Sequence, residues 1–329
     1  MKKFLNSAET LLAESLDGFS AAHADIVQLG EERKYVRRRV LKPGKVALIS
    51  GGGSGHEPLH AGFVGQGMLD AACPGQVFTA PTPDQMLAAA EAVETGAGVL
   101  FIVKNYEGDV MNFDMAREMT GRRIDTVLVD DDVAVEKSTY SVGRRGVAGT
   151  LVVQKMLGAA AEQGADLAAL TALGQRVVRA TRSMGVALTS CTVPAAGRPT
   201  FELAPDEMEF GVGIHGEPGR RRGKLAPLDA LADEMLGAVL GDLGLARPGE
   251  VLLLVNGFGG TPLMELYAMF HAARGRIEAA GGRVARALVG NYVTSLDMAG
   301  CSVTVTALDA ELAALWDAPV HTAGLRWGT

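Results

Sequence analysis

The sequence predicts an α/β protein, in which helices flank mainly parallel or mixed β-sheets. Short apolar runs that have the character of buried strands alternate with stretches of helical length and periodicity along most of the chain. Polar and glycine-rich clusters follow the ends of several of these runs, where open α/β sheets bind their ligands. A length of 329 residues corresponds to about two domains. We expect an N-terminal α/β domain over residues 1–183 and a C-terminal one over residues 184–329.

Local signals predict the elements of the first half. Residues 4–23 have the spacing of an amphipathic helix, and residues 46–49 form the first buried strand. Thr82-Pro83-Asp84-Gln85 combines an N-cap, a proline at the first helical position and a capping-box glutamine, so a helix begins there. The other predicted elements are strands at 99–103 and 124–129 and helices at 112–119, 146–163 and 166–182.

The alternation restarts after Gly185. Thr261-Pro262 starts a long helix, and the glycine pair at 281–282 ends it. The other elements predicted in this half are strands at 186–189, 251–255, 284–289 and 302–306 and a helix at 228–240.

Composition and charge argue against several classes of protein. The net charge is −7 without a basic stripe, so we expect no nucleic acid or membrane as a partner. Cys73, Cys191 and Cys301 are far apart and form no CxxC motif, which is typical of free thiols in a reducing compartment. With no apolar run of membrane-spanning length, the chain is expected to be cytoplasmic.

A glycine-rich loop, Gly51-Gly52-Gly53-Ser54-Gly55, follows the first buried strand. Glycines at this place let the backbone turn sharply and approach a ligand closely. His56 stands where the phosphate-binding P-loop needs lysine and where the dinucleotide fingerprint and the serine-hydrolase elbow need glycine. The loop therefore argues against nucleotide binding and serine-hydrolase chemistry. A purely structural turn remains the alternative.

Two patterns raise the question of a metal. His56-Glu57-Pro58-Leu59-His60 matches the H-E-x-x-H motif of zinc proteases, which requires an established helix. Pro58 and the preceding glycines argue against such a helix, so a metalloenzyme is kept only as an alternative. Asp130-Asp131-Asp132 has the chemistry of a magnesium site. A loop that caps a strand and the next helix is the favoured interpretation.

Three further side chains are candidates for chemistry. Lys104 and Asp109 follow the strand at 99–103; a lysine can donate to a polarised oxygen and an aspartate can accept a hydroxyl proton. Solvated loop charges are the alternative. His215 lies among four glycines between residues 211 and 219, and a neutral imidazole is both a nucleophile and a base. A structural histidine is the alternative there.

Ten motifs in order, over nearly the whole chain, resemble the dihydroxyacetone kinases and in particular their free-standing dihydroxyacetone-binding subunits. The motifs are GGGSGHEP (51–58), ACPGQVFTAPTPDQ (72–85), KNYEGD (104–109), DDDVAV (130–135), GRRGVAGT (143–150), CTVPAAG (191–197), EFGVGIHGEPG (209–219), GGTPLMELY (259–267), TSLDMAG (294–300) and LWDAPVH (315–321).

This resemblance implies two α/β domains, a homodimer and a substrate that is held covalently. His215 corresponds to the family's histidine that attacks the ketone carbon of dihydroxyacetone and forms a hemiaminal, which places the covalent histidine in the C-terminal domain. His56 and Asp109 correspond to the acid and base near the substrate hydroxyl, without a decision between them. The substrate-binding residues implied by the resemblance are Gly53, Ser54, Gly55, His56, Lys104, Asp109 and His215.

The resemblance also implies a partner. The chain ends at Thr329 without the additional nucleotide-binding domain of single-chain relatives. We therefore expect no cofactor on this chain, and Mg-ADP or Mg-ATP on a second kinase subunit. A phosphoprotein of the phosphoenolpyruvate phosphotransferase system or ATP itself would supply the phosphoryl group. The alternatives are a kinase subunit for another short ketose, such as erythrulose, and a non-catalytic, triose-binding regulator; retention of His56, Asp109 and His215 argues against the regulator.

Overall fold

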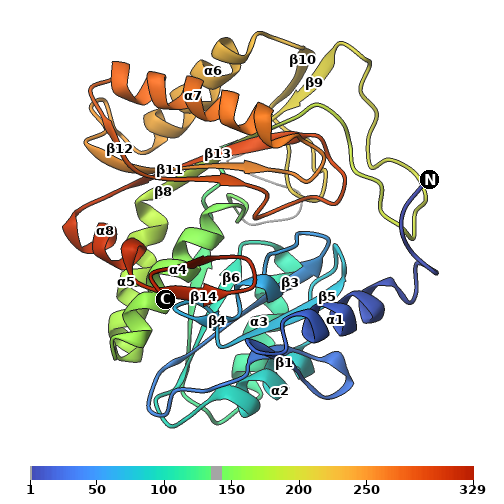
Figure 1. The fold of residues 1–329 in the computed structure, drawn as a ribbon, viewed down its shortest axis with the longest axis vertical. Coiled ribbons are helices and arrows are strands. Elements are labelled where there is room, and N and C mark those ends of the chain that lie inside the picture. Colours follow the sequence, from blue (N-terminus) through green and yellow to red (C-terminus); the bar gives the residue numbers. More distant parts are fainter. Residues whose placement is uncertain (1, 135–142) are drawn as a thin grey trace.

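The fold comes from a computed structural model that describes residues 2–134 and 143–329, so Val135 of the DDDVAV motif lies outside the described residues. Two six-stranded sheets lie one above the other with helices around and between them (Figure 1). The predicted α/β class is confirmed, and the sheets are mixed. No helix of the described residues is long and apolar enough to span a membrane.

The first sheet has a parallel centre. β3 pairs in parallel with β5 and β6, and β6 pairs in parallel with β7, while β1 and β2 form an antiparallel edge. Every residue of β3 and β6 is buried, as expected for strands covered on both faces. In spatial order the strands are β1 (Val27–Leu29), β2 (Val36–Arg38), β5 (Ala71–Val77), β3 (Ala47–Ser54), β6 (Val99–Lys104) and β7 (Ile124–Val129).

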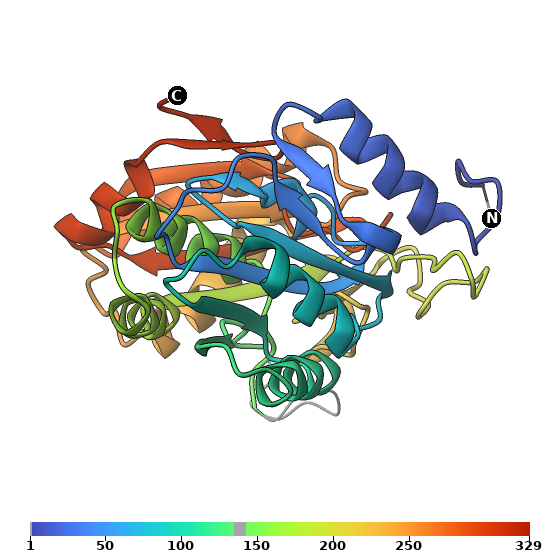
Figure 2. The same ribbon diagram turned by 90° about the horizontal axis from the view of Figure 1, so that it is seen from below.

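Helices cover both faces of this sheet. α2 (Pro83–Val93) and α3 (Glu107–Glu118) pack on one face, and α4 (Gly149–Glu162) and α5 (Leu167–Arg179) on the other. The capping box predicted at Thr82 forms. α1 (Leu11–Ala22) lies along the outside of the molecule, away from α4 and α5 (Figure 2).

The second sheet is mostly antiparallel. Only β11 and β12 pair in parallel among its described strands. α6 (Leu228–Asp242) and α7 (Leu263–Ala279) cover its outer face. In spatial order the strands are β10 (Arg221–Lys224), β9 (Glu207–Phe210), β8 (Thr181–Ala187), β13 (Gly300–Ala307), β11 (Glu250–Gly257) and β12 (Arg283–Gly290).

The two sheets share one core through α4. All residues of α4 from Gly149 to Ala161 are buried, which is the pattern of a helix inside a protein and not on its surface. Its apolar side chains join the core of the first sheet to Leu252 and Leu254, on the inner face of the second sheet. The division of the chain at residues 183 and 184 stays a prediction; β8, the first strand of the second sheet along the chain, begins at Thr181.

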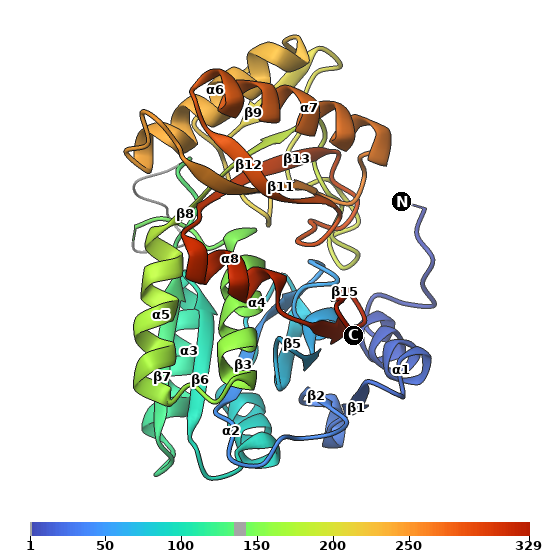
Figure 3. The same cartoon turned by 60° about the vertical axis from the view of Figure 1, so that its left-hand side comes forward.

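The C-terminal segment returns to the first sheet. α8 (Ala310–Asp317) packs beside α4 (Figure 3). The strands β14 (Val320–Thr322) and β15 (Arg326–Trp327) then form a small sheet with β4 (Gly65–Gln66). The buried ammonium of Lys155 on α4 donates to the carbonyl of Leu315, at 2.8 Å, and ties this segment to the centre.

Some predicted boundaries were wrong. α1 begins at Leu11 and not at residue 4, and α3 begins at Glu107 and not at residue 112. The helix predicted at 166–182 ends at Arg179, because Thr181 already pairs with β13. Such boundaries depend on pairing with strands far away in the sequence, which local periodicity does not reveal. Most of the elements not predicted are short, although β5 has seven residues and α8 has eight. They are β1, β2, β4, β5, β9, β10, α8, β14, β15 and the 3-10 helices Glu31–Arg33 and Ala61–Phe63.

The packing of α4 predicts opposite results for two glycine substitutions. A Cβ at Gly158 would lie 2.3 Å from the carbonyl oxygen of Gly67 and 2.4 Å from the Cα of Met68, whereas a Cβ at Gly237 on α6 meets nothing within 4 Å. Gly158→Ala should lower the free energy of unfolding by about 1–3 kcal/mol through overpacking. Gly237→Ala should raise it by about 0.5–1 kcal/mol through helix propensity. Urea denaturation measures both, and equal effects would contradict the central position of α4.

Candidate active site between the two sheets

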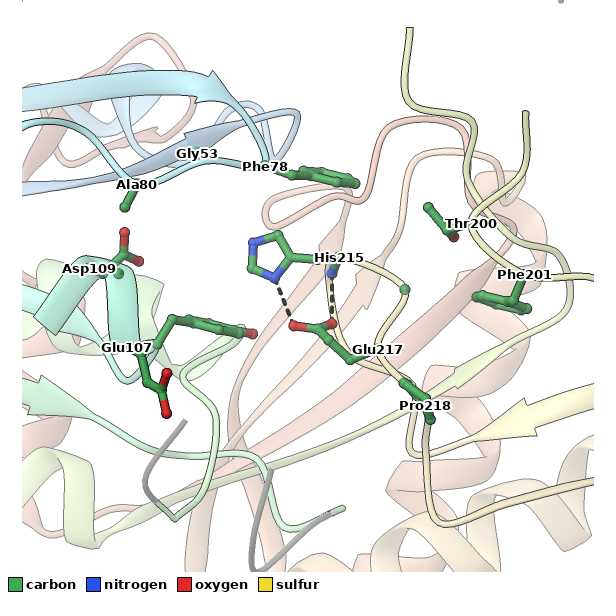
Figure 4. A pocket seen from close by; sticks show the side chains of 13 residues that line it. Gly53, Phe78, Ala80, Glu107, Asp109, Thr200, Phe201, His215, Glu217 and Pro218 are labelled. Atoms are coloured by element: carbon green, nitrogen blue, oxygen red, sulfur yellow. Dashed lines mark hydrogen bonds and ion pairs between the residues drawn. The ribbon is translucent and has the colours of Figure 1, made fainter. Parts of the chain in front are cut away.

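A cavity of about 690 Å³ lies between loops of the two sheets (Figure 4). On the first sheet, its walls follow the carboxyl ends of β3, β5 and β6, where the sequence predicted a ligand site. On the second sheet, its walls are the loop after β9, which carries His215, and Thr200 and Phe201 of the segment between β8 and β9. The lining residues are Gly53, Phe78, Ala80, Tyr106, Glu107, Gly108, Asp109, Thr200, Phe201, His215, Gly216, Glu217 and Pro218.

His215 is held by Glu217. Nδ1 of the imidazole donates to one carboxylate oxygen at 2.8 Å, and the backbone N–H of His215 donates to the other at 2.9 Å (Figure 4). Burial disfavours the charge of Glu217, but His215 and then Arg145 outweigh this effect and lower the pKa of the carboxyl to about 2. In the neutral imidazole, this contact puts the hydrogen on Nδ1 and leaves the lone pair on Nε2.

His56 is completely buried and presents the same nitrogen. Its Nδ1 donates to the carbonyl of Thr294 at 2.7 Å, and its Nε2 has no hydrogen-bond partner in the described residues. Burial lowers the pKa of His56 well below its ordinary value, and the neighbouring His215 and Lys104 lower it further. His56 is therefore a neutral base whose lone pair accepts no hydrogen bond from residues 2–134 or 143–329.

Aromatic rings fix the two histidines relative to each other. The ring centroid of His215 lies 4.7 Å from that of His56, 4.7 Å from that of Tyr106 and 5.2 Å from that of Phe78, each in an edge-to-face arrangement. His56 in turn stacks on Phe78 at 5.0 Å. These contacts leave the His215 ring little room to turn, so the direction of its Nε2 atom is fixed.

Lys104 and Asp109 form an ion pair at the edge of the cavity. Nζ of the fully buried Lys104 donates to Asp109 at 2.9 Å. Asp109 lies in the first turn of α3, where the helix dipole favours a negative charge. A Cβ at Gly52 would lie 2.3 Å from Nζ of Lys104, so the glycine makes room for the ammonium.

The glycine-rich loop contributes one lining residue. Gly53 borders the cavity, while Ser54 and Gly55 are not among its lining residues. The Ser54 hydroxyl donates to the carbonyl of Gly75 at 2.7 Å, and the Gly55 N–H donates to the carboxylate of Glu57 at 3.0 Å. These contacts hold the loop in place behind the site.

Asp131 joins the two sheets. It follows β7 of the first sheet and accepts hydrogen bonds from the N–H groups of Val147 and Gly149 at the start of α4, at 2.8 and 2.7 Å. It also accepts from the hydroxyl of Ser183 on β8, at 2.5 Å. Burial raises the pKa of Asp131 to about 6, against the effect of these hydrogen bonds.

Asp132 continues this connection to the His215 loop. Its carboxylate pairs with the buried guanidinium of Arg145 at 2.7 Å, and Arg145 donates to the carbonyl of Gly211 at 2.7 Å. A Cβ at Gly213 would lie 2.6 Å from Arg145 and 2.0 Å from Glu217, so this loop closes around both side chains only with glycine. Asp131 and Asp132 therefore make the structural contacts of a loop that caps a strand and the next helix. That interpretation was favoured over a magnesium site.

The H-E-x-x-H segment does not have the geometry of a zinc protease. Residues 56–60 form turns and not an α-helix, as Pro58 predicted. Over residues 2–134 and 143–329, no three or more His, Cys, Asp or Glu side chains group in a way that could hold a metal ion.

Comparison with known proteins identifies the family. The family model described as "Dak1 domain" matches residues 17–324. This chain belongs to the Dak1 family. It is 47% identical to the "PEP-dependent dihydroxyacetone kinase, dihydroxyacetone-binding subunit DhaK" of Escherichia coli (strain K12), over 100% of both chains. The resemblance proposed from the motifs is confirmed.

Two solved structures show how far the Dak1 likeness extends. A structure of the dihydroxyacetone kinase of C. freundii "in complex with AMP-PNP and Mg2+" matches with a TM-score of 0.88 and 33% identity, over 99% of this chain and 61% of that one. The "dihydroxyacetone kinase operon co-activator Dha-DhaQ" matches with a TM-score of 0.88 and 34% identity, over 93% and 96%. The same fold thus occurs in a kinase and in a co-activator.

Sequence reasoning missed several residues of this Dak1 site. Glu217 stands two residues after His215 in the same motif, a spacing that permits the contact but does not establish it. Tyr106 lies between Lys104 and Asp109, in the KNYEGD motif. Phe78 and Arg145 come from other parts of the chain, and no local signal links them to His215.

The lowered pKa of His56 predicts a pH dependence of stability. The ordinary pKa of histidine is 6.5. Below this pH the unfolded chain binds a proton at His56, whereas the folded chain does not. The free energy of unfolding therefore falls as the pH falls. His56→Gln should reduce the slope of the unfolding free energy against pH by up to about 1.4 kcal/mol per pH unit between about pH 5 and 6. Urea titrations measure the slope. The exposed His271 provides the control His271→Gln, and an equal slope in wild type and His56→Gln would refute the prediction.

Proposed function

We propose that this chain is the dihydroxyacetone-binding subunit of a dihydroxyacetone kinase and holds its ketose as a hemiaminal on His215. One observation carries the proposal: Glu217 takes Nδ1 of His215, which leaves the Nε2 lone pair for a ligand in the cavity. Membership of the Dak1 family and the full-length similarity to a binding subunit support it.

The first step is capture of the ketone. Nε2 of His215 attacks the carbonyl carbon, a C–N bond forms, and the carbonyl π electrons move to oxygen. The alkoxide gains a proton as the imidazole gives up the hydrogen on Nδ1, so the product is a neutral hemiaminal. The Glu217 carboxylate stabilises the positive charge that develops on the ring between these events. Glycerol has no carbonyl and is therefore not captured.

The second step is phosphoryl transfer to the terminal hydroxyl. His56 takes the hydroxyl proton, because its Nε2 is not otherwise bonded in the described residues, whereas Asp109 is paired with Lys104. Lys104 and Asp109 bind and orient the ketose, with the backbone of Gly53 on the other side. The hydroxyl oxygen attacks the terminal phosphorus of the donor, and the bond between that phosphorus and the rest of the donor breaks. The hemiaminal then reverses: its hydroxyl gives up its proton, the C=O bond forms again, the C–N bond to His215 breaks and Nδ1 regains its hydrogen, so that dihydroxyacetone phosphate is released. Ser54 and Gly55 shape the loop that carries Gly53.

The phosphoryl donor comes from a partner. We assign Mg-ADP or Mg-ATP to a separate kinase subunit, in keeping with the C. freundii enzyme, of which this chain matches 61% and whose structure contains AMP-PNP and Mg²⁺. The Escherichia coli relative is named PEP-dependent. A phosphoprotein of the phosphoenolpyruvate phosphotransferase system is therefore the proposed source of the phosphoryl group. The working unit is a cytoplasmic homodimer of this chain together with that subunit.

A triose-binding regulator is the second candidate. The likeness to the Dha-DhaQ co-activator favours it, since that protein covers almost the same length at the same TM-score. Both candidates require a ketose site, but only the kinase subunit requires a base beside the terminal hydroxyl. The presence of His56 and Asp109 together therefore supports the kinase.

Covalent capture is testable on the chain alone. With dihydroxyacetone labelled with ¹³C at its carbonyl carbon, wild type should convert the ketone signal to that of a tetrahedral carbon, and native mass spectrometry should show a gain of one triose. His215→Ala should abolish both signals, while His271→Ala, which removes an exposed histidine, should keep them. An adduct that survives His215→Ala would overturn the assignment.

The proposed base predicts a separation of the two steps. His56→Asn should retain the hemiaminal and reduce kcat at least about 100-fold in the presence of the kinase subunit and its phosphoryl donor, because proton abstraction is lost. Erythrulose, assayed beside dihydroxyacetone, shows which ketose has the higher kcat/KM. An adduct without any phosphorylation by wild type would favour the regulator over the kinase.

A further inference from the structure

His60 is a buried histidine with no role in the steps above. Only 5% of its surface is exposed, and it lies in the turn that follows the glycine-rich loop. Its Nδ1 lies 3.0 Å from the hydroxyl of Ser50 and 2.9 Å from the side-chain amide of Gln154 on α4. Because Ser50 on β3 and Gln154 on α4 both contact Nδ1, the orientation of this buried imidazole is fixed.

The neighbours of Nδ1 determine the tautomer. The Ser50 hydroxyl donates its hydrogen to the carbonyl of Ile102 at 2.6 Å, so it offers only lone pairs to His60. The structure places the amide nitrogen of Gln154 2.9 Å from Nδ1 and leaves the amide oxygen Oε1 without a hydrogen-bond partner among the described residues. The oxygen and nitrogen of an amide exchange places by a half-turn, and the Ser50 lone pair beside Nδ1 favours the orientation in which Oε1 accepts from this nitrogen. Nδ1 therefore carries the hydrogen and Nε2 the lone pair.

That lone pair lies beside Lys104. A Cβ at Gly52 would lie 3.2 Å from Nε2 of His60 and 2.3 Å from Nζ of Lys104, so both nitrogens occupy the same side of this glycine. Nε2 is buried and makes no hydrogen bond within the described parts of the chain. Among charged groups, Lys104 has the largest electrostatic effect on His60, ahead of His56. The gap between the two nitrogens is short enough to be closed by a turn of the lysine side chain or bridged by one water.

We propose that His60 is a positioning residue for Lys104, whose ammonium it holds over Gly52 by accepting a hydrogen at Nε2. A buried ammonium has three hydrogens to satisfy, and Asp109 takes one of them. With His60 as the second acceptor, the third hydrogen is directed at the bound ketose. Ser50 and Gln154 keep the imidazole in the required tautomer. This inference rests on the proposed function only for the identity of the ketose.

The contact itself is testable without any substrate. In protein labelled with ¹⁵N at histidine, the two ring nitrogens of neutral His60 give separate resonances, and a hydrogen bond to the lone pair shifts that of Nε2. Lys104→Met should move this resonance towards the position of a lone pair without a hydrogen bond. The control Lys224→Met, at an exposed lysine paired with Asp206, should leave it in place. An unmoved Nε2 resonance in Lys104→Met overturns the proposal whatever the ketose assays give.

A matched pair of variants tests the consequence for binding. Gln at position 60 places an acceptor near the site of Nε2, and Met has similar length without one. His60→Met should raise the dihydroxyacetone concentration that half-saturates the hemiaminal about tenfold, the effect of losing one hydrogen bond to a charged group. His60→Gln should recover most of that loss. In the assay with the kinase subunit, the change should appear in KM and not in kcat.

Two results would contradict this role. Equal half-saturation by the Gln and Met variants would show that His60 acts only through packing. A loss of dihydroxyacetone affinity in both variants, in proportion to the drop in their melting temperatures, would also show that His60 acts only through packing. Absence of an adduct in wild type would instead refute the covalent capture and leave the ¹⁵N result to decide the role of His60.

Discussion

The structure depends on two buried carboxylates, Asp131 and Asp132. Charges taken out of water are stable only when hydrogen bonds and opposite charges replace their hydration. Here the replacement comes from separate parts of the fold: the start of α4, β8 of the second sheet, and Arg145. Removal of one partner would leave a buried charge uncompensated, so these elements hold one another in a single arrangement.

Through Arg145 the same cluster reaches the active site. Arg145 binds the carbonyl of Gly211 and helps to keep Glu217 ionised, and Glu217 sets the tautomer of His215. A structural ion pair at the junction of the sheets thus helps to determine which nitrogen of His215 keeps its lone pair. His56 follows the same rule with a neutral acceptor, the carbonyl of Thr294. In both histidines the acceptor at Nδ1 leaves the lone pair on Nε2.

The glycines at the site act by the space they leave. Gly52 admits the Lys104 ammonium, and Gly213 admits Arg145 and Glu217, at distances that no Cβ would allow. Buried polar side chains can then approach the backbone closely enough to satisfy one another. This accounts physically for a glycine-rich loop that ends in His56 and carries no phosphate-binding lysine.

The sequence alone determined the fold class, the parallel strands β3, β6 and β7, and the helix at Thr82, because apolar runs and capping signals are local. Its motifs also pointed to the Dak1 family, and to His56, Lys104, Asp109 and His215 as candidates for the site. Only the tertiary structure decided that His215 contacts Glu217, Tyr106, Phe78 and His56 at once. It also decided that β8 begins within the predicted helix and that α8 returns to α4. Those outcomes depend on contacts between residues far apart in the chain, and a linear pattern carries no information about which distant groups share a hydrogen bond or a buried charge.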